Sequence, residues 1–337
     1  MARCPHSRSR WRAERDIMTV TRREVILAGI GLGVALAARP HIARGGWTGP
    51  RRFNSFGTVP SRGATDQTKM LQSAVDAAAW SGLPLFLPPG VYSTRRLELR
   101  SGSHLTGVPG RSILRYRGGG GLIGIEQAQD IRLDGLVLDG DGRDMGVYGA
   151  LLAATMVKRL QLTNCRLLRS GSGGILVSCC EDVVISRNIV DKAATGIAVT
   201  NVAQGGSSAL IQGNLIRNLF FRKVALSHGN GIVIGADAVA KGNIVQNAPG
   251  FGILVGSICE VSISNNRIRH THIGIGVPAE IAETARLAGN MISNAQNGAV
   301  RAMRGPTPIG PHLAVYAGAW LEGSALADQR GAAAAAF

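Results

Sequence analysis

An asparagine-led segment recurs along the chain and limits its fold more than any other feature of the sequence. Successive leading asparagines are 24, 26, 29, 23 and 24 residues apart, and their segments end in Gly-Ile-x-Val or a looser copy of it. Self-similarity at such a period is typical of stacked repeat proteins. The leading residues are Asn164, Asn188, Asn214, Asn243, Asn266 and Asn290.

Each repeat contains three short apolar pieces: an alternating run before the asparagine, the Asn-x-Ile piece itself, and Gly-Ile-x-Val. Alternation with a period of two predicts strands that bury one face. No repeat contains a helix-length amphipathic run, which argues against ankyrin, tetratricopeptide and leucine-rich repeats. Three short strands per coil predict an all-β fold, a right-handed single-stranded parallel β-helix, with coils stacked about 4.8 Å apart.

The repeat also suggests roles for its glycine and its asparagine. Glycine before Ile-x-Val suits a corner where two backbones approach closely. The asparagine side chains are expected to bond their neighbours in a ladder along the stack. Asp139 is expected to take the place of the asparagine in the coil before Asn164.

A helix is predicted ahead of the repeats. Residues 64–68 supply a polar start, with Thr65 or Asp66 as the cap, and Gly82 ends the helix. Residues 83–92 follow as a strand and a turn. The open end of a stack of parallel strands would template aggregation, so the helix is expected to cap that end. Its apolar residues at helical spacing are Met70, Leu71, Ala74, Val75 and Ala78.

Residues 1–44 are predicted to be an export leader. Residues 21–27 resemble the twin-arginine motif, and a Gly/Ala-rich apolar run at 25–38 overlaps and follows it. That run is too short for a comfortable transmembrane helix, so cleavage is expected, with a retained membrane anchor as the alternative. The protein is then expected in the periplasm or outside the cell, with the twin-arginine export machinery as a partner. Residues 1–17 precede Met18, which is an alternative start.

The remaining chain divides into a repeat domain at 53–304 and an irregular, low-complexity tail at 305–337. The net charge is +16, but residues 1–52 contribute +8 of it, so the body is only moderately basic. No Lys/Arg run is interleaved with aromatic residues, which argues against nucleic-acid binding. A moderate positive balance fits an acidic polymer. The cysteine spacing shows no zinc-site pattern.

Loops of unequal length follow the Asn-x-Ile pieces and are predicted to leave the same corner of every coil. The longest lies within residues 215–230. Asp144, Arg169 and Asp191 each lie five residues before a repeat glycine, so they are expected to stack in three successive coils. The predicted edge gathers Asp139, Asp141, Asp144, Arg169, Asp191, Lys192, Arg222, Lys223, His228, His270 and His272.

The start of the repeat domain resembles the pectate-lyase-like superfamily of β-helices. Residues 63–66 (Gly-Ala-Thr-Asp), 71–76 (Leu-Gln-Ser-Ala-Val-Asp) and 87–92 (Leu-Pro-Pro-Gly-Val-Tyr) carry this resemblance. With its leader and repeats, the chain is similar over about 20–305 to a family of twin-arginine-exported repeat proteins of unknown activity. The resemblance implies the β-helix and leaves the chemistry open, because the superfamily includes lyases, hydrolases, epimerases and non-enzymes. The sequence lacks the active-site motifs of polygalacturonases and alginate epimerases.

Two enzyme mechanisms could use the predicted edge. A glycoside hydrolase needs an acid and a base carboxylate about 5 to 9 Å apart, for which Asp144 with Asp191, or Asp139 with Asp141, are candidates. A uronate lyase or epimerase needs cations beside a base. The catalytic candidates are Asp144, Arg169, Asp191, Lys223 and His228. The substrate-binding candidates are Asp139, Asp141, Lys192, Arg222, His270 and His272.

These patterns lead to two functional hypotheses. The first is an exported protein that binds an acidic envelope or extracellular polysaccharide and cleaves it as a lyase or hydrolase. The second is a non-catalytic structural or adhesive repeat protein, for which the edge is only a surface charge ladder. No cofactor is assigned, and Asp139-Gly-Asp-Gly142 is most simply a turn, with a calcium site as the alternative.

Overall fold

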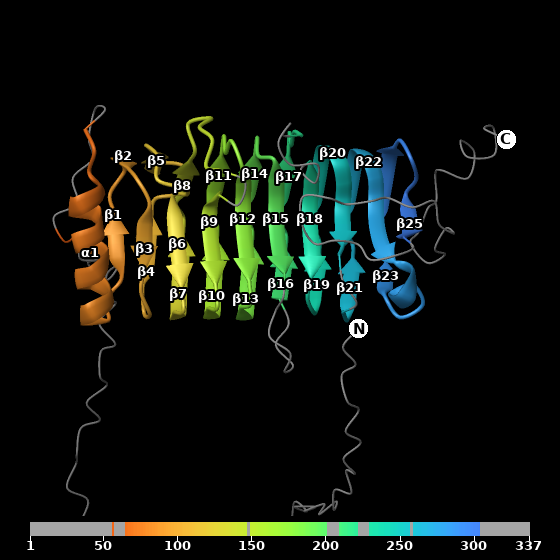
Figure 1. Ribbon diagram of the computed structural model, residues 1–337, viewed down its shortest axis with the longest axis horizontal. Helices are drawn as coiled ribbons and strands as arrows, with labels where there is room; N and C mark the ends of the chain where they lie inside the picture. The colour runs from red at the N-terminus through yellow and green to blue at the C-terminus, as the bar shows by residue number, and fades with distance from the viewer. Residues whose placement is uncertain are drawn as a thin grey trace, which may run out of the picture. The chain divides into compact units, whose positions relative to one another are not determined.

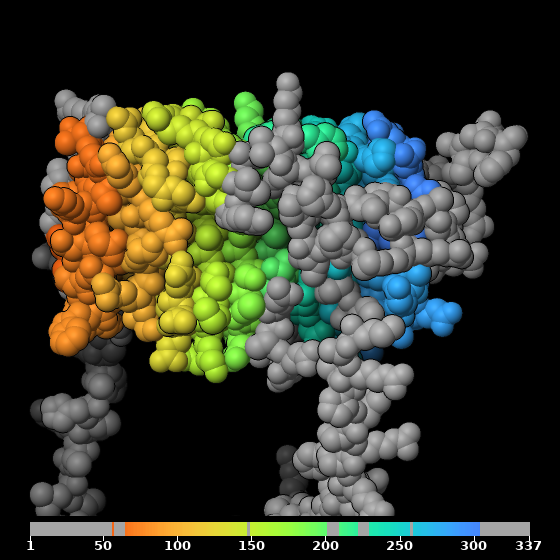
Figure 2. Space-filling view, viewed as in Figure 1, coloured from red at the N-terminus to blue at the C-terminus, as the bar shows by residue number. Residues whose placement is uncertain are grey.

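The structure, a computed structural model, describes residues 56, 65–146, 149–200, 209–221, 229–256 and 259–303. These residues form a parallel β-helix in which the chain passes through three rows of strands in each coil (Figure 1). The predicted all-β fold with one helix ahead of the strands is confirmed. Figure 2 shows the coils as successive bands of colour, because each coil lies beside its neighbours in sequence.

The first row, sheet A, consists of nine parallel strands stacked in chain order. They are β1 (Leu85–Leu87), β4 (His104–Gly107), β7 (Gln129–Asp134), β10 (Lys158–Thr163), β13 (Glu181–Ser186), β16 (Ala209–Gln212), β19 (Ala238–Lys241), β21 (Val261–Ser264) and β23 (Arg286–Ala288).

The second and third rows, B and C, join into one sheet because β20 (Ile244–Val255) and β22 (Arg267–Pro278) run through the corner between them. Row B also contains β2 (Gly90–Thr94), β5 (Ser112–Tyr116), β8 (Val137–Asp139), β11 (Arg166–Leu168), β14 (Ile189–Asp191), β17 (Leu215–Arg217) and β24 (Met291–Ala295). Row C also contains β3 (Leu97–Leu99), β6 (Ile123–Glu126), β9 (Ala150–Thr155), β12 (Gly173–Ser178), β15 (Thr195–Thr200), β18 (Asn230–Gly235) and β25 (Val300–Met303).

Alternate residues of each strand point into the coil and stack on the same position of the next coil. In row C, for example, Ile175 pairs with Ile197 and Val177 with Val199, and all four side chains are buried. Burying such a side chain stabilises the fold by about 1.5 to 3 kcal/mol. The period-two pattern in the sequence therefore sets the interior of the coil.

The outward side of row C is mostly apolar or small. The register row from Gly124 through Leu176 and Leu254 to Gly276 contains no titratable side chain. A second apolar cluster, separate from the interior, lies over its later strands. This cluster contains Val233, Phe251, Leu254, Ile273 and Met303. The titratable side chains of this register row stand at its two ends, Glu98 before Gly124 and Arg301 after Gly276.

A buried asparagine ladder runs between sheet A and row B. In each step the side-chain oxygen of one asparagine accepts a hydrogen bond from the backbone N–H of the asparagine before it, at 2.9 to 3.1 Å. Its side-chain nitrogen donates, at 2.8 to 2.9 Å, to a backbone carbonyl of the sheet A strand in the preceding coil. The members are Asn188, Asn214, Asn243, Asn266 and Asn290, all at most 1% exposed.

Two residues that the repeat pattern assigned to the ladder, Asn164 and Asp139, lie at other positions of their coils. Cys165, and not Asn164, occupies the ladder position of its coil, since the backbone N–H of Cys165 donates to Asn188 Oδ1 at 2.9 Å. Asn164 lies one residue earlier and takes a left-handed conformation with φ 54°. Asp139 lies three residues after the ladder position, in register with Leu168 of β11. The repeat length varies between coils, so counting alone could not resolve these offsets.

The glycine that starts Gly-Ile-x-Val is required by close packing between coils, as predicted. A Cβ on Gly196 would collide with the carbonyl oxygen of Gly231 in the next coil and with Ile216. The equivalent Gly231 would collide with the carbonyl of Gly252 and with Val245. Any larger residue here would separate two coils.

The predicted helix is α1 (Thr68–Ser81), and it packs against the first strands of the stack (Figure 1). Gly82 ends the helix in a left-handed conformation with φ 65°. Asp66 Oδ1 accepts a hydrogen bond from the backbone N–H of Thr68 at 2.9 Å, and the bonds from Thr68 lower the pKa of Asp66. The side chain of Gln67, at the N-cap position, makes no cap bond. The helix buries Leu71, Ala74, Val75 and Ala78.

Candidate functional site

The loops that follow row B leave one corner of the stack, as the sequence predicts, and this corner joins row B to row C. We call it the BC corner. At one position of this corner, a non-glycine residue in each of six successive coils has a left-handed backbone with φ between 54° and 62°. Asparagine and histidine adopt this conformation more readily than most residues. The six are Arg169, Lys192, Asn218, Asn247, His270 and Asn294.

Asp139 lies at the early end of the BC corner and is held by arginines. Its carboxylate accepts hydrogen bonds from Arg115 Nε at 3.4 Å and from Arg169 Nε at 3.0 Å, and Arg169 Nη2 also contacts Oδ2. The backbone N–H of Asp141 donates to Asp139 Oδ1 at 3.0 Å. The hydrogen bonds with Asp139 raise the pKa of Arg169. Asp139 is only 4% exposed, so removing a partner would leave a buried charge poorly compensated.

Asp141 continues the same charge network. Arg143 Nε lies 3.4 Å from Asp141 Oδ2, and Arg169 Nη2 lies 3.8 Å from Asp141 Oδ1. Calcium ligands in proteins are oxygen atoms that point at a shared centre. Both oxygens of Asp139 instead accept from guanidinium groups, so these two aspartates do not fit a calcium site. In the described residues no three His, Cys, Asp or Glu side chains are grouped to hold a metal ion.

Asp191 is the next carboxylate along the corner. Arg217 Nε and Nη2 lie 3.0 and 2.9 Å from Asp191 Oδ2, and Asn218 Nδ2 donates to Oδ1 at 2.9 Å. Asn247 Nδ2 in turn donates to Asn218 Oδ1 at 3.0 Å. Asp191 therefore accepts bonds at both of its carboxylate oxygens.

The predicted stack of Asp144, Arg169 and Asp191 does not form. Asp191 and Asp139 are both in register with Leu168, so Arg169 lies one residue further along the coil. Asp144 is an exposed residue after β8, and its Oδ1 accepts from Gly146 N at 2.8 Å and from Ser172 Oγ at 3.2 Å. The prediction fails because the loop between row B and the repeat glycine differs in length from coil to coil. Residues that lie five positions before that glycine therefore do not occupy the same position in each coil.

The late end of the BC corner is basic. Arg269, His270 and His272 lie at this corner on β22, and Arg267 lies at the start of row B on the same strand. Within the described ranges none of the four forms an ion pair. Arg269 Nε is buried and has no hydrogen-bond partner. His270 Nε2 lies 3.0 Å from Asn294 Nδ2.

His272 is bonded on both ring nitrogens. Its Nε2 lies 2.9 Å from Asn297 Nδ2, and its Nδ1 lies 3.4 Å from Gln296 Oε1. An amide nitrogen can only donate and an amide oxygen can only accept. The ring of His272 therefore lies between an amide nitrogen and an amide oxygen of the next coil.

Two aromatic rings stand beside the corner after β17. Phe221 is 58% exposed and Phe220 36% exposed, although large apolar side chains are normally buried. An exposed ring next to hydrogen-bonding groups is a common recognition surface. The sequence reasoning did not assign a role to these rings, nor to Arg217, Asn218 and Asn247. Two adjacent phenylalanines after a short strand are the sequence feature that points to such a surface.

Three predicted site residues in the long loop, Arg222, Lys223 and His228, lie outside the described residues. Lys192 is exposed at the corner and forms no ion pair within the described part of the chain. Of the sequence-predicted residues, the structure thus places Asp139, Asp141 and Arg169 in one network and His270 and His272 on one strand. Asp144 contacts Gly146 and Ser172 instead.

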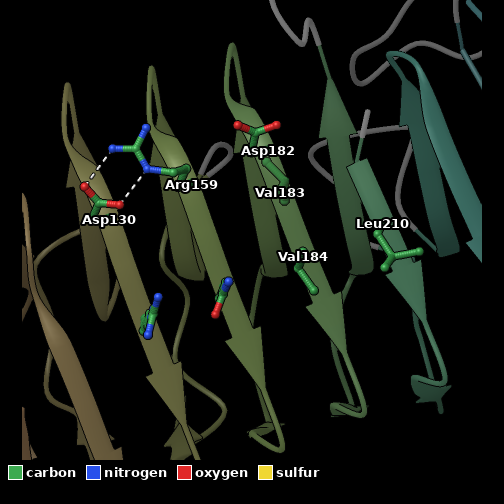
Figure 3. Close-up of a pocket in the computed structure, with 8 residues that line it drawn as sticks. Asp130, Arg159, Asp182, Val183, Val184 and Leu210 are labelled. Atoms are coloured by element: carbon green, nitrogen blue, oxygen red, sulfur yellow. Dashed lines mark hydrogen bonds and ion pairs between the residues drawn. The ribbon is translucent and has the colours of Figure 1, made fainter. Parts of the chain in front are cut away.

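A groove of about 240 Å³ lies on a different surface, across strands β7, β10, β13 and β16 of sheet A. Figure 3 shows Asp130, Arg159 and Asp182 on three neighbouring strands, with Val184 and Leu210 further along the same face. None of the eleven predicted site residues lines this groove.

Comparison with solved structures finds β-helix proteins. The A-module of the mannuronan C-5 epimerase AlgE6 from Azotobacter vinelandii has a TM-score of 0.50 at 15% identity, covering 74% of this chain and 78% of that one. The catalytic unit of a GH87 α-1,3-glucanase from Streptomyces thermodiastaticus has a TM-score of 0.48 at 16% identity, covering 74% and 60%. The surface protein and adhesin PfbA from Streptococcus pneumoniae has a TM-score of 0.46 at 13% identity, covering 74% and 78%. At these identities the likeness concerns the fold.

A search of curated protein sequences finds no match. A family model does match, over residues 51–276, and it spans the helix, the first coils and most of the asparagine ladder. This range is more than half of the chain. The chain therefore belongs to the rhamnogalacturonase A/epimerase, pectate lyase-like family.

Proposed function

We propose that this protein binds an acidic polysaccharide along the BC corner. One observation carries the proposal: the corner carboxylates Asp139, Asp141 and Asp191 are matched by arginines, whereas Arg267, Arg269, His270 and His272 form no ion pair within the described residues. Among the described residues, a polymer carboxylate would find the unmatched guanidinium groups of Arg267 and Arg269 at the late end, and the exposed Lys192 earlier along the corner.

The chemistry of the late end suits a uronate unit. Guanidinium groups bind carboxylates with two parallel hydrogen bonds, and Arg269 Nε is a buried donor without a partner. The amides of Asn218 and Asn247 offer bonds to hydroxyl groups. The exposed ring of Phe221 offers an apolar surface to the face of a sugar. Membership of a family named for rhamnogalacturonase and epimerase supports a polysaccharide as the ligand.

We propose binding, rather than cleavage, as the primary activity. A hydrolase needs one carboxylic acid that donates a proton to the leaving group. Asp139 and Asp191 are each held in ion pairs with arginines, so both carboxylates are already engaged within the protein. Because these carboxylates are held in ion pairs, a non-catalytic adhesive protein is the second candidate function. An activity assay tests the alternative, in which Asp144, or the predicted lyase residues Lys223 and His228, cleave the polymer.

The proposal also covers where in the cell the protein works. The twin-arginine motif at 21–27, which lies outside the described residues, supports export to the periplasm or the medium and the narrower resemblance to a twin-arginine-exported family. Among the described residues no helix is long and apolar enough to cross a bilayer.

The proposal is tested by titrating the protein with oligogalacturonate and oligoguluronate in a calorimeter. We expect Arg269→Gln and Arg267→Gln each to weaken binding about tenfold, because each removes a charged hydrogen bond. Binding should also weaken with added salt. Arg286→Gln, an exposed arginine on the sheet A strand β23, is the matched control and should change nothing.

Activity is measured on the same samples. Reducing ends report hydrolysis, and the absorbance of unsaturated products together with reducing ends reports β-elimination. Binding of both uronate oligomers with equal affinity by the wild type and the Arg269 and Arg267 variants would refute the corner as the site. Release of products would show that the protein is an enzyme and would contradict the adhesive function.

A further inference from the structure

The groove on sheet A is separate from the BC corner and is lined by a different set of groups. One register row crosses it, pairing Arg132 with Gln161, Gln161 with Val184, and Val184 with Leu210. The row therefore passes from a cation, through an amide, to two aliphatic side chains over four coils. Coils are about 4.8 Å apart, a step comparable to one pyranose unit of an extended chain.

A fixed ion pair stands at one end of the groove. Arg159 Nε and Nη2 lie 2.6 and 2.7 Å from the two oxygens of Asp130 (Figure 3). Asp130, and to a lesser degree Asp182, raise the pKa of Arg159. The two bonds orient the guanidinium before any ligand arrives, which lowers the entropy lost on binding.

The other polar groups of the groove are available to a ligand. In the described ranges the exposed side chains of Arg132, Gln161 and Asp182 make no hydrogen bond to other residues. Arg132 and Gln161 offer polar groups at one end of the groove, and Asp182 offers an acceptor on β13 beside Val184. Val184 and Leu210 are half-buried and offer an apolar surface at the other end. A few polar groups beside an apolar floor are typical of small-molecule sites.

The charges of the groove select the class of ligand. Two carboxylates, Asp130 and Asp182, balance two guanidinium groups, Arg132 and Arg159. A uronate would approach Asp182 at a cost, whereas a neutral sugar would use hydroxyl groups as both donors and acceptors. The C–H face of such a sugar would lie on the aliphatic pair.

From this geometry we propose a neutral-sugar subsite on sheet A, formed by Arg159, Asp182, Gln161, Val184 and Leu210. It rests on the proposed function, because it assumes that the ligand is a polysaccharide. It extends that function to a heteropolymer whose acidic units bind at the corner and whose neutral units bind on sheet A. Two weak subsites on one polymer strengthen binding by effective concentration.

The full chain is titrated with cellohexaose, xylohexaose, mannohexaose and maltohexaose, and separately with oligogalacturonate. We expect at least one neutral hexasaccharide to bind. Asp182→Asn should weaken that binding about tenfold, since the neutral amide is a poorer acceptor than a carboxylate. Asparagine tolerates the left-handed backbone of Asp182, φ 53°, so the variant keeps the fold.

Val184→Thr keeps the side-chain shape and should also weaken neutral-sugar binding, because it places a hydroxyl in the apolar floor. Gln212→Ala, an exposed change on β16 outside the groove, is the matched control and should leave both titrations unchanged. The groove variants should bind oligogalacturonate like the wild type.

The two proposals can fail separately. If no neutral hexasaccharide binds, or if Asp182→Asn and Val184→Thr bind it like the wild type, the sheet A subsite is refuted while the corner is unaffected. If neutral sugar binds in the groove but oligogalacturonate does not bind at all, the subsite is supported and the acidic ligand at the corner is refuted.

Discussion

Single asparagine side chains link the coils of this protein. Each ladder asparagine except the last, Asn290, bonds to the coil on either side. Each position is buried, so water cannot replace a lost partner. The sequence predicts such a ladder because the asparagines recur with the strands. It does not tell whether Asn164 or its neighbour Cys165 belongs to it, since both lie in the same turn.

We expect Asn243→Ala to lower the free energy of unfolding by about 3 kcal/mol or more. The change leaves buried N–H and C=O groups of neighbouring coils without partners, and each such group costs about 1 to 3 kcal/mol. Asn214 N and Asn214 Nδ2, both 3.0 Å from Asn243 Oδ1, are the groups most affected. Urea unfolding followed by circular dichroism measures the loss. Asn297→Ala, an exposed position, should cost less than about 1 kcal/mol, and equal losses would contradict the ladder's role.

His104 should make stability depend on pH. Burial, and then the charge of Arg132, lower the pKa of His104 below its usual 6.5, while Asp134 opposes the shift. The unfolded chain therefore binds the proton first as the pH falls. Stability contributed by the neutral imidazole is present above about pH 6.5 and is lost as the pH falls from there through the lower folded-state pKa.

The measurement compares unfolding midpoints at pH 7.5 and pH 5.5 for the wild type and for His104→Gln. The wild type should lose more stability on acidification than the variant. His270→Gln, at an exposed position on another face, serves as the reference. A variant whose midpoint falls as far as that of the wild type would show that His104 does not titrate in this window.

At the scale of elements, α1 covers the first coil. Its buried side chains belong to the same apolar cluster as the interior of the stack. The sequence predicts this helix well, because its apolar spacing and the glycine at its end are local signals.

We expect Leu71→Ala to destabilise the protein by about 2 to 5 kcal/mol, the usual range for a leucine removed from a core. Leu71 is 1% exposed. Met70→Ala, one residue earlier and half-buried, should cost clearly less. Thermal and urea unfolding of both variants provide the test. A similar loss for both would mean that the helix does not contribute its Leu71 face to the core.

The whole molecule is a one-dimensional stack, so protection against exchange should vary along it. Each central coil is bonded to a neighbour on both sides, whereas β24 and β25 are each paired only with β22 among the described strands. In stacked repeats, stability depends on nearest-neighbour contacts. We expect backbone amides of β13 and β14 to exchange about tenfold more slowly than those of β24 and β25. Hydrogen exchange read by mass spectrometry decides this, and uniform exchange along the stack would contradict it.

The stack also divides the charges of the BC corner into two parts. The early coils hold aspartates bonded to arginines, and the late coils hold unpaired cations on β22. Sequence reasoning found the aspartates, Arg169 and the two histidines, because charged loops on one corner must meet. It missed Arg267 and Arg269, which lie within a strand of the repeat rather than in a loop. It also missed the pairing, since Arg115 and Arg217 come from other coils and neither lies next in sequence to its aspartate.

The sequence by itself determined the fold, because alternation with a period of two, the recurring asparagine and the packing glycine are local signals repeated in every coil. Only the tertiary structure decided which side chains touch. Contacts between coils join residues about 23 to 30 positions apart, and loop lengths shift that distance from coil to coil. A slip of one residue exchanges the inward and outward faces of a strand and changes every neighbour. For that reason the stack of Asp144, Arg169 and Asp191 failed, and the groove on sheet A could not be foreseen.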